Sequence, residues 1–126
     1  MKKVLIADDS SMARSIIRRC LEIAGGRDWE YVEAPDGAAA LEVLRQGGVD
    51  LLVTDLNMPT LDGLELVRRA RSSPRLNGLP VVVVTSAGNP DVQKKLEEAG
   101  AASVLLKPVS PAKLAETLAS LAKEDP

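Results

Sequence analysis

Short apolar runs alternate with longer amphipathic segments along the whole chain, and this alternation restricts the fold more than any other feature. Four of the runs have unbroken apolar centres, VLIA, LLV, VVVV and VLL, which are typical of strands buried on both faces of a parallel sheet. The run around Tyr31 is more mixed and fits an edge strand. The predicted strands are Lys3–Ala7, Trp29–Glu33, Asp50–Thr54, Pro80–Thr85 and Ala102–Leu106.

Each predicted strand is followed by a segment whose apolar residues recur at helical spacing. The first such segment covers Ser10–Ala24, and a weaker one covers Asp36–Gln46. Asn89-Pro90 and Ser110-Pro111 each provide an N-cap side chain followed by proline at the first helical position. Gly100 fits the left-handed residue that ends a helix. A βα unit repeated five times predicts one parallel sheet with helices on both faces.

Composition narrows the classes of function. The chain has 126 residues with 45% apolar and 27% charged side chains, which fits one globular domain. The net charge of -2 and the lack of aromatic residues other than Trp29 and Tyr31 argue against a nucleic-acid partner. The N-terminal apolar run stops at Asp8, too early for a signal peptide or a membrane span. We therefore expect a cytoplasmic protein without a membrane partner, and the single cysteine, Cys20, fits a reducing compartment.

Polar side chains end the predicted strands, where ligands bind in open α/β sheets. Asp8 and Asp9 follow the first strand, Asp55 the third, Thr85 ends the fourth, and Lys107 follows the fifth. Three neighbouring carboxylates repel one another unless a cation compensates their charge. The chain has no histidine, which excludes imidazole ligands and Ser–His or Cys–His catalysis. Mg²⁺ is therefore the favoured ion, and Mn²⁺ could replace it.

These groups suit phosphoryl transfer to a carboxylate. A carboxylate can attack a phosphoryl donor to form an acyl phosphate, and the reaction needs positive charge near the phosphoryl oxygens. Asp55 is the best candidate nucleophile because its strand is central in the sequence and the unusual run Asn57-Met58-Pro59 follows it. Lys107 would supply an ammonium group and Thr85 a hydroxyl donor.

Each of these residues also has an ordinary structural explanation. Asp8 and Asp9 could cap the first helix, Asp55 and Thr85 could belong to turns, and Lys107 could be a solvated surface charge. The functional interpretation depends on one architecture that brings all of them together.

Four stretches of the sequence resemble the receiver domains of two-component response regulators, in particular the CheY-like single-domain members. The resemblance implies a flavodoxin-like (CheY-like), doubly wound, five-stranded parallel sheet of strand order 2-1-3-4-5 with five helices. It also implies that residues 1–126 form a single receiver domain without an output domain. The stretches span nearly the whole chain in the family's order and read ADDSSMARSIIRRCLE, VTDLNMPTLDGLELVRRAR, LPVVVVTSAG and AGAASVLLKPVSPAKL.

The resemblance assigns roles around the cation. Asp55 would accept the phosphoryl group in a Mg²⁺-dependent reaction. The side chains of Asp9 and Asp55 and the backbone carbonyl of Asn57 would ligate Mg²⁺, and Asp8 would act through a metal-bound water.

The resemblance also implies a conformational switch. Thr85 would move toward the phosphoryl group and Lys107 would pair with its oxygens, with a cis peptide bond between Lys107 and Pro108. Many receivers carry Tyr or Phe three residues before this lysine, where the present chain has Val104. The usual coupling between the threonine and a switch aromatic is therefore not expected here.

The implied partners are proteins. A histidine kinase or a histidine phosphotransfer protein would donate the phosphoryl group, and Arg14 and Ser15 on the first helix are candidate contacts with it. Phosphorylation would shift a two-state equilibrium read by a downstream protein, for example in chemotaxis or motility. We expect a monomer, with dimerisation on phosphorylation left open. Such a domain catalyses its own phosphorylation and slow dephosphorylation and is not a turnover enzyme.

Two other functions stay open from the sequence alone. A phosphatase of the haloacid-dehalogenase type also forms an aspartyl phosphate, but it uses a second Asp two residues later as general acid, where this chain has Asn57. A pseudo-receiver would keep the fold as an interaction module without phosphorylation. Val104 favours that alternative, and the complete set of acidic, hydroxyl and ammonium residues argues against it.

Overall fold

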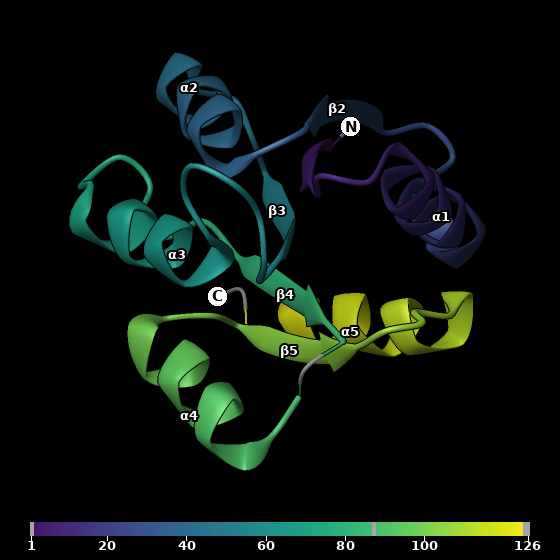
Figure 1. Cartoon of the computed structure of the whole chain (residues 1–126). Coiled ribbons are helices and arrows are strands. Elements are labelled where there is room, and N and C mark those ends of the chain that lie inside the picture. The colour runs from purple at the N-terminus through teal and green to yellow at the C-terminus, as the bar shows by residue number, and fades with distance from the viewer. Residues whose placement is uncertain (1, 87, 125–126) are drawn as a thin grey trace.

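The computed structural model describes residues 2–86 and 88–124, which contain one five-stranded parallel sheet of order β2-β1-β3-β4-β5 (Figure 1). This confirms the flavodoxin-like fold and its strand order. The strands are β1 (Lys3–Ala7), β2 (Glu30–Ala34), β3 (Leu51–Asp55), β4 (Val81–Thr85) and β5 (Ser103–Leu106). The helices are α1 (Ser11–Leu21), η1 (Glu22–Gly26), α2 (Gly37–Gln46), α3 (Gly63–Ser72), α4 (Pro90–Ala99) and α5 (Pro111–Glu124).

Helices cover both faces of the sheet: α1 and α5 lie on one face, and α2, α3 and α4 lie on the other (Figure 1). Successive strand residues point to opposite faces, so Leu5 packs in the α2–α4 core whereas Val4 and Ile6 pack in the α1–α5 core. Every residue of β3 and β4 is buried, which explains their unbroken apolar runs. Among residues 2–86 and 88–124, none of the helices has the length and apolar character needed to cross a lipid bilayer.

Element boundaries differ slightly from the sequence prediction. Strands β2 and β3 each start and end one residue later than predicted, because their register with β1 sets the paired residues. Regular α-helix in α1 ends before the predicted Ala24, and the chain continues as the wider turn η1, in which Gly25 has a φ of 126°. The predicted caps at Asn89 and Gly100 are confirmed, with Gly100 in the left-handed conformation.

Arg71 joins the end of α3 to two loops through bonds to backbone carbonyls. Its Nε donates to Gly100 at 3.0 Å, Nη2 donates to Leu79 at 2.6 Å, and Nη1 donates to Leu76 and Asn77 at 3.2 and 2.9 Å. These carbonyls lie outside the strands and helices, and the guanidinium supplies donors to them; the Leu76 carbonyl also accepts the N–H of Leu79 at 3.0 Å. Arg71 therefore holds the α3–β4 and α4–β5 connections together.

Replacing Arg71 with methionine is expected to lower the free energy of unfolding by about 2 to 3 kcal/mol, because charge-assisted hydrogen bonds to half-buried acceptors are lost. Urea denaturation measures the change. Arg69→Met is the matched control: the Nε of Arg69 pairs with Glu65 at 3.3 Å, with side chains 49% and 41% exposed, and this pair should contribute about 0.5 kcal/mol or less. Equal losses in the two variants would contradict the role assigned to Arg71.

Candidate functional site

Three carboxylates meet at the carboxyl edge of the sheet. Asp8 and Asp9 follow the last residue of β1, and Asp55 is the last residue of β3, paired with Val84 of β4. One carboxylate oxygen from each of these three aspartates lies within 4.8 Å of the other two. We call Asp8, Asp9 and Asp55 the acidic cluster. Asp8 and Asp55 are buried, and Asp9 is exposed.

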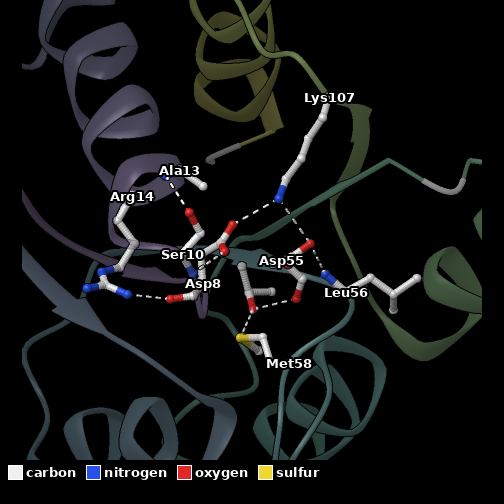
Figure 2. Close-up of polar contacts among 9 residues, drawn as sticks. Asp8, Ser10, Ala13, Arg14, Asp55, Leu56, Met58 and Lys107 are labelled. Carbon is white, nitrogen blue, oxygen red and sulfur yellow. Dashed lines mark hydrogen bonds and ion pairs between the residues drawn. The ribbon is translucent and has the colours of Figure 1, made fainter.

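Lys107 extends into the acidic cluster from the loop after β5 (Figure 2). Its Nζ lies 3.0 Å from Oδ2 of Asp8 and 3.5 Å from Oδ1 of Asp55. The backbone N–H of Lys107 donates to the carbonyl of Thr85 at 2.9 Å, and the peptide bond from Lys107 to Pro108 is cis. The ammonium group thus contacts two buried carboxylates rather than solvent alone.

Local hydrogen bonds orient the two buried carboxylates (Figure 2). Oδ1 of Asp8 accepts the N–H of Ser10 at 2.9 Å, and Oδ1 of Asp55 accepts the N–H of Leu56, also at 2.9 Å. The N-cap of α1 is Ser10, whose hydroxyl accepts the N–H of Ala13. Because Ser10 fills the cap position, helix capping does not account for the Asp8 side chain.

The first turn of α3 lies directly against the backbone of Asp55. The N–H of Gly63 donates to the carbonyl of Leu56 at 2.8 Å. A Cβ atom at position 63 would overlap the carbonyl oxygen of Asp55 and would lie 2.9 Å from Cα of Leu56. Only glycine permits this approach. This contact was not predicted from the sequence; the available signal was a glycine directly after an N-cap residue, Asp62.

The remaining predicted residues lie at or near the same edge. Thr85 is the buried last residue of β4, and Asn57 is exposed in the β3–α3 loop, two residues after Asp55. Val104 lies in β5, partly buried against the α2–α4 core. The structure therefore brings Asp8, Asp55 and Lys107 into contact, and it links Thr85 to Lys107 through the backbone.

The partner contact predicted at Arg14 stays a prediction, and the structure shows contacts of this side chain within the chain itself. The Arg14 side chain is only 16% exposed, and it bonds Glu33 and the backbone of Asp8. Ser15, beside it in α1, is exposed. Arg14 is therefore a residue of the site itself, and the sequence pattern, a polar residue on an amphipathic helix, did not reveal it.

Burial and neighbouring charges shift the pKa values of Asp55 and Lys107. Burial and the negative charge of Asp8 raise the pKa of Asp55, and the nearby ammonium of Lys107 and the N–H of Leu56 offset this only in part. Burial lowers the pKa of Lys107, but its hydrogen bond to Asp8 and the charges of Asp55 and Asp8 outweigh burial, so that its pKa is raised. One ammonium therefore does not balance the acidic cluster.

The donor atoms of the acidic cluster fit a hard divalent cation. All are carboxylate oxygens within 4.8 Å of one another, the ligand type that Mg²⁺ and Mn²⁺ take in proteins. A cation there would also offset the repulsion that raises the pKa of Asp55. The residues present thus fit Mg²⁺ or Mn²⁺ on geometry and on charge.

Comparison with known proteins establishes the family. The family profile described as the response regulator receiver domain matches residues 4–119. The chain belongs to the response regulator receiver domains. Among its relatives, the chemotaxis protein CheY of Pseudomonas aeruginosa is 39% identical over 116 residues, 92% of each chain.

Solved structures agree with this assignment. The chemotaxis protein CheY4 of Vibrio cholerae has a TM-score of 0.85 at 31% identity, covering 96% of this chain and 98% of that one. The Mn²⁺-bound form of the response regulator Rcp1 has a TM-score of 0.78 at 27% identity, covering 98% and 93%. The present chain is thus a CheY-like receiver domain, and one receiver of the same fold is described as binding Mn²⁺.

Replacing Asp55 with asparagine is expected to raise the melting temperature of the metal-free receiver domain at neutral pH. The pKa of Asp55 is raised in the folded state, so the ionised carboxylate costs folding free energy at a pH above its folded pKa. As the pH falls through that value, the folded wild type takes up the proton and recovers stability relative to the variant. Thermal unfolding of both proteins in a chelator, from neutral to mildly acidic pH, checks this. An advantage of the variant that grows in acid would contradict the sign.

Proposed function

We propose that this receiver domain is a phosphorylation switch in a two-component phosphorelay, in which Asp55 accepts a phosphoryl group from a phosphohistidine. The donor is a histidine kinase or a histidine phosphotransfer protein. The observation that carries the proposal is the position of Lys107 Nζ, 3.0 Å from Asp8 and 3.5 Å from Asp55, beside carboxylates that fit a divalent cation. A carboxylate with positive charge close by is what formation of an acyl phosphate requires.

The transfer step uses the chain's own groups as follows. A carboxylate oxygen of Asp55 attacks the phosphorus, an O–P bond forms, the P–N bond of the donor breaks, and its electron pair returns to the imidazole nitrogen. The N–H of Leu56 holds the carboxylate in orientation. Lys107 moves its charge from the carboxylates to the phosphoryl oxygens, and the hydroxyl of Thr85 donates to one of them.

A divalent cation completes the charge balance in this proposal. The side chains of Asp9 and Asp55 and the backbone carbonyl of Asn57 would hold Mg²⁺ or Mn²⁺, with Asp8 acting through a bound water. When bound, the ion supplies further positive charge to the phosphoryl oxygens. Asp8, whose carboxylate contacts Lys107 at 3.0 Å, keeps the ammonium beside the cluster before transfer.

The signal would pass from Lys107 and Thr85 to the surface. The hydrogen bond from the N–H of Lys107 to the carbonyl of Thr85 joins the loop after β5 to the end of β4. A shift of both residues toward the phosphoryl group would bias a two-state equilibrium in the face formed by α4, β5 and α5. Val104 in β5 has no aromatic ring, so we infer that transmission runs through the β4–α4 loop instead. A downstream protein would bind this face, and the names of the relatives favour chemotaxis or motility.

Incubation with acetyl phosphate and Mg²⁺, followed by intact mass measurement, tests the proposal. The wild type should gain one phosphoryl group, and Asp55→Asn, which keeps the shape of the side chain, should gain none. A sample treated with a chelator should also stay unmodified. A folded, Mg²⁺-bound wild type that gains no phosphoryl group would instead support the pseudo-receiver, which keeps the fold as an interaction module.

A further inference from the structure

Arg14 on α1 forms a bridge between the ends of β1 and β2, next to the acidic cluster. Its Nη1 donates to the backbone carbonyl of Asp8 at 2.6 Å, and its Nε donates to Oε1 of Glu33 at 2.8 Å (Figure 2 shows the first contact). The Arg14 side chain is 16% exposed. The guanidinium therefore contacts both partners in a largely enclosed position.

The carbonyl of Asp8 lies at the point where β1 stops pairing with its neighbouring strands. The register between β1 and β2 ends with Ala7 opposite Ala34, and the N–H of Asp8 still donates to the carbonyl of Ala34 at 3.1 Å. Beyond this point the Asp8 carbonyl needs another donor, and Arg14 supplies it. The planar guanidinium suits this task because it offers donors in fixed directions to two acceptors at once.

The position of the Asp9 carboxylate depends on the backbone at Asp8 more than the position of the Asp8 carboxylate does. The Asp8 side chain is held by Ser10 and Lys107. Asp9 is exposed, and none of the hydrogen bonds found among the described residues holds its carboxylate. The position of the Asp9 carboxylate therefore follows from the backbone at Asp8, which Arg14 fixes.

We propose that Arg14 is a positioning residue for the divalent cation: through the Asp8 carbonyl it sets where the carboxylates of Asp8 and Asp9 lie relative to Asp55. This inference rests on the proposed function, because it assigns the acidic cluster to a cation. Glu33 also contributes to cation binding in this proposal. The charge of Arg14 alone would repel a cation, and the ion pair with Glu33 makes the positioning group nearly neutral.

The ion pair between Arg14 and Glu33 determines which variants have to be compared. Arg14→Met alone removes a positive charge, which by itself would strengthen cation binding and mask a loss of position. The double variant R14M/E33Q removes one charge of each sign and leaves the net charge unchanged. R18M/E22Q is its matched control, because it also removes one charge of each sign but leaves the Arg14–Glu33 pair in place. Arg18 pairs with Glu22 at 4.0 Å, its side chain is 45% exposed, and it makes no bond to Asp8 in the part of the chain that the structure describes.

Calorimetric titration of the full chain with Mg²⁺, repeated with Mn²⁺, provides the test. R14M/E33Q should bind Mg²⁺ about tenfold more weakly than wild type, in the range typical of groups that orient metal ligands, and R18M/E22Q should stay within about twofold. In R14K/E33Q the lysine ammonium can reach only one of the two acceptors. The Mg²⁺ affinity of R14K/E33Q should therefore lie between the affinities of wild type and R14M/E33Q. Circular dichroism at the titration temperature verifies that each variant is folded.

The outcomes separate this inference from the proposed function. Equal Mg²⁺ affinity in wild type and R14M/E33Q, or equal weakening in both double variants, overturns the role of Arg14 while phosphorylation of Asp55 can still be observed. A wild type that binds Mg²⁺ but gains no phosphoryl group overturns the proposed function alone. A wild type without Mg²⁺ affinity overturns both. If R14M/E33Q does not fold, the Mg²⁺ affinity of R14K/E33Q is compared with that of R18K/E22Q, and equal affinity overturns the role of Arg14.

Discussion

Replacing Lys107 with methionine is expected to lower the free energy of unfolding of the metal-free protein by about 3 to 5 kcal/mol, the usual result of removing one partner of a buried ion pair. The Asp8 side chain is 1% exposed and that of Asp55 is 10% exposed, and both contact this ammonium. Without it, two buried carboxylates face each other with no opposing charge. Because the pKa of Lys107 is raised, its stabilising contribution is complete at neutral pH and is lost only as the pH rises through that raised value.

Two controls make the Lys107 prediction specific. The double variant K107M/D8N should recover part of the lost stability, because asparagine removes one of the two buried carboxylates and its repulsion of the other, Asp55. Lys113→Met removes a lysine whose Nζ lies 3.9 Å from the exposed Glu116 and should change stability by about 0.5 kcal/mol or less. Chemical denaturation in a chelator measures all three. A K107M protein as stable as wild type would show that the ammonium does not compensate the acidic cluster.

Replacing Gly63 with alanine is expected to cost about 3 kcal/mol of stability and to slow phosphoryl uptake, because the added methyl group overpacks a site with no room for it. The new Cβ would overlap the Asp55 carbonyl oxygen and approach Cα of Leu56 to 2.9 Å. Both obstacles are backbone atoms, so relief requires the start of α3 or the end of β3 to move. Movement of β3 displaces the proposed phosphoacceptor.

Gly78→Ala is the matched control for Gly63→Ala. A Cβ at Gly78 would meet no atom within 4 Å, and its backbone is outside the left-handed region. The substitution should therefore be neutral or stabilise by about 0.5 kcal/mol through the unfolded state. Urea denaturation and the rate of mass gain with acetyl phosphate measure the two effects. A Gly63→Ala protein that matches Gly78→Ala in both would contradict the close contact between α3 and Asp55.

The sheet could be predicted because burial on both faces leaves a plain signal in the sequence. The three inner strands, β1, β3 and β4, carry unbroken apolar runs, and every residue of β3 and β4 is buried. The edge strand β5 also carries an apolar run, although Leu105 is its one buried residue. The other edge strand, β2, mixes polar and apolar residues, of which Ala34 is buried, and its start was predicted one residue early. Regular α-helix in α1 ends at Leu21, before the predicted Ala24, because the hydrogen-bond pattern widens in η1; Gly25, whose backbone is no longer helical, directly follows the predicted end.

The centre of the site could be predicted for a topological reason, and its surroundings could not. Parallel strands end at one edge, so Asp8, Asp55 and Lys107 had to come close together once the strand order was known. Arg14 and Arg71 escaped prediction because their partners are backbone carbonyls, which any sequence supplies. A polar residue on an amphipathic helix looks the same from sequence whether it faces water or bonds a carbonyl.

The most direct test of the central claim locates the acyl phosphate. Borohydride reduces an acyl phosphate to an alcohol and so converts a phosphorylated aspartate to homoserine, which peptide mass spectrometry assigns to one position. We predict homoserine in place of Asp55 after treatment with acetyl phosphate and Mg²⁺, and none after treatment with a chelator. Homoserine in place of Asp8 or Asp9, or at no position in the Mg²⁺-treated protein, would contradict the proposed switch.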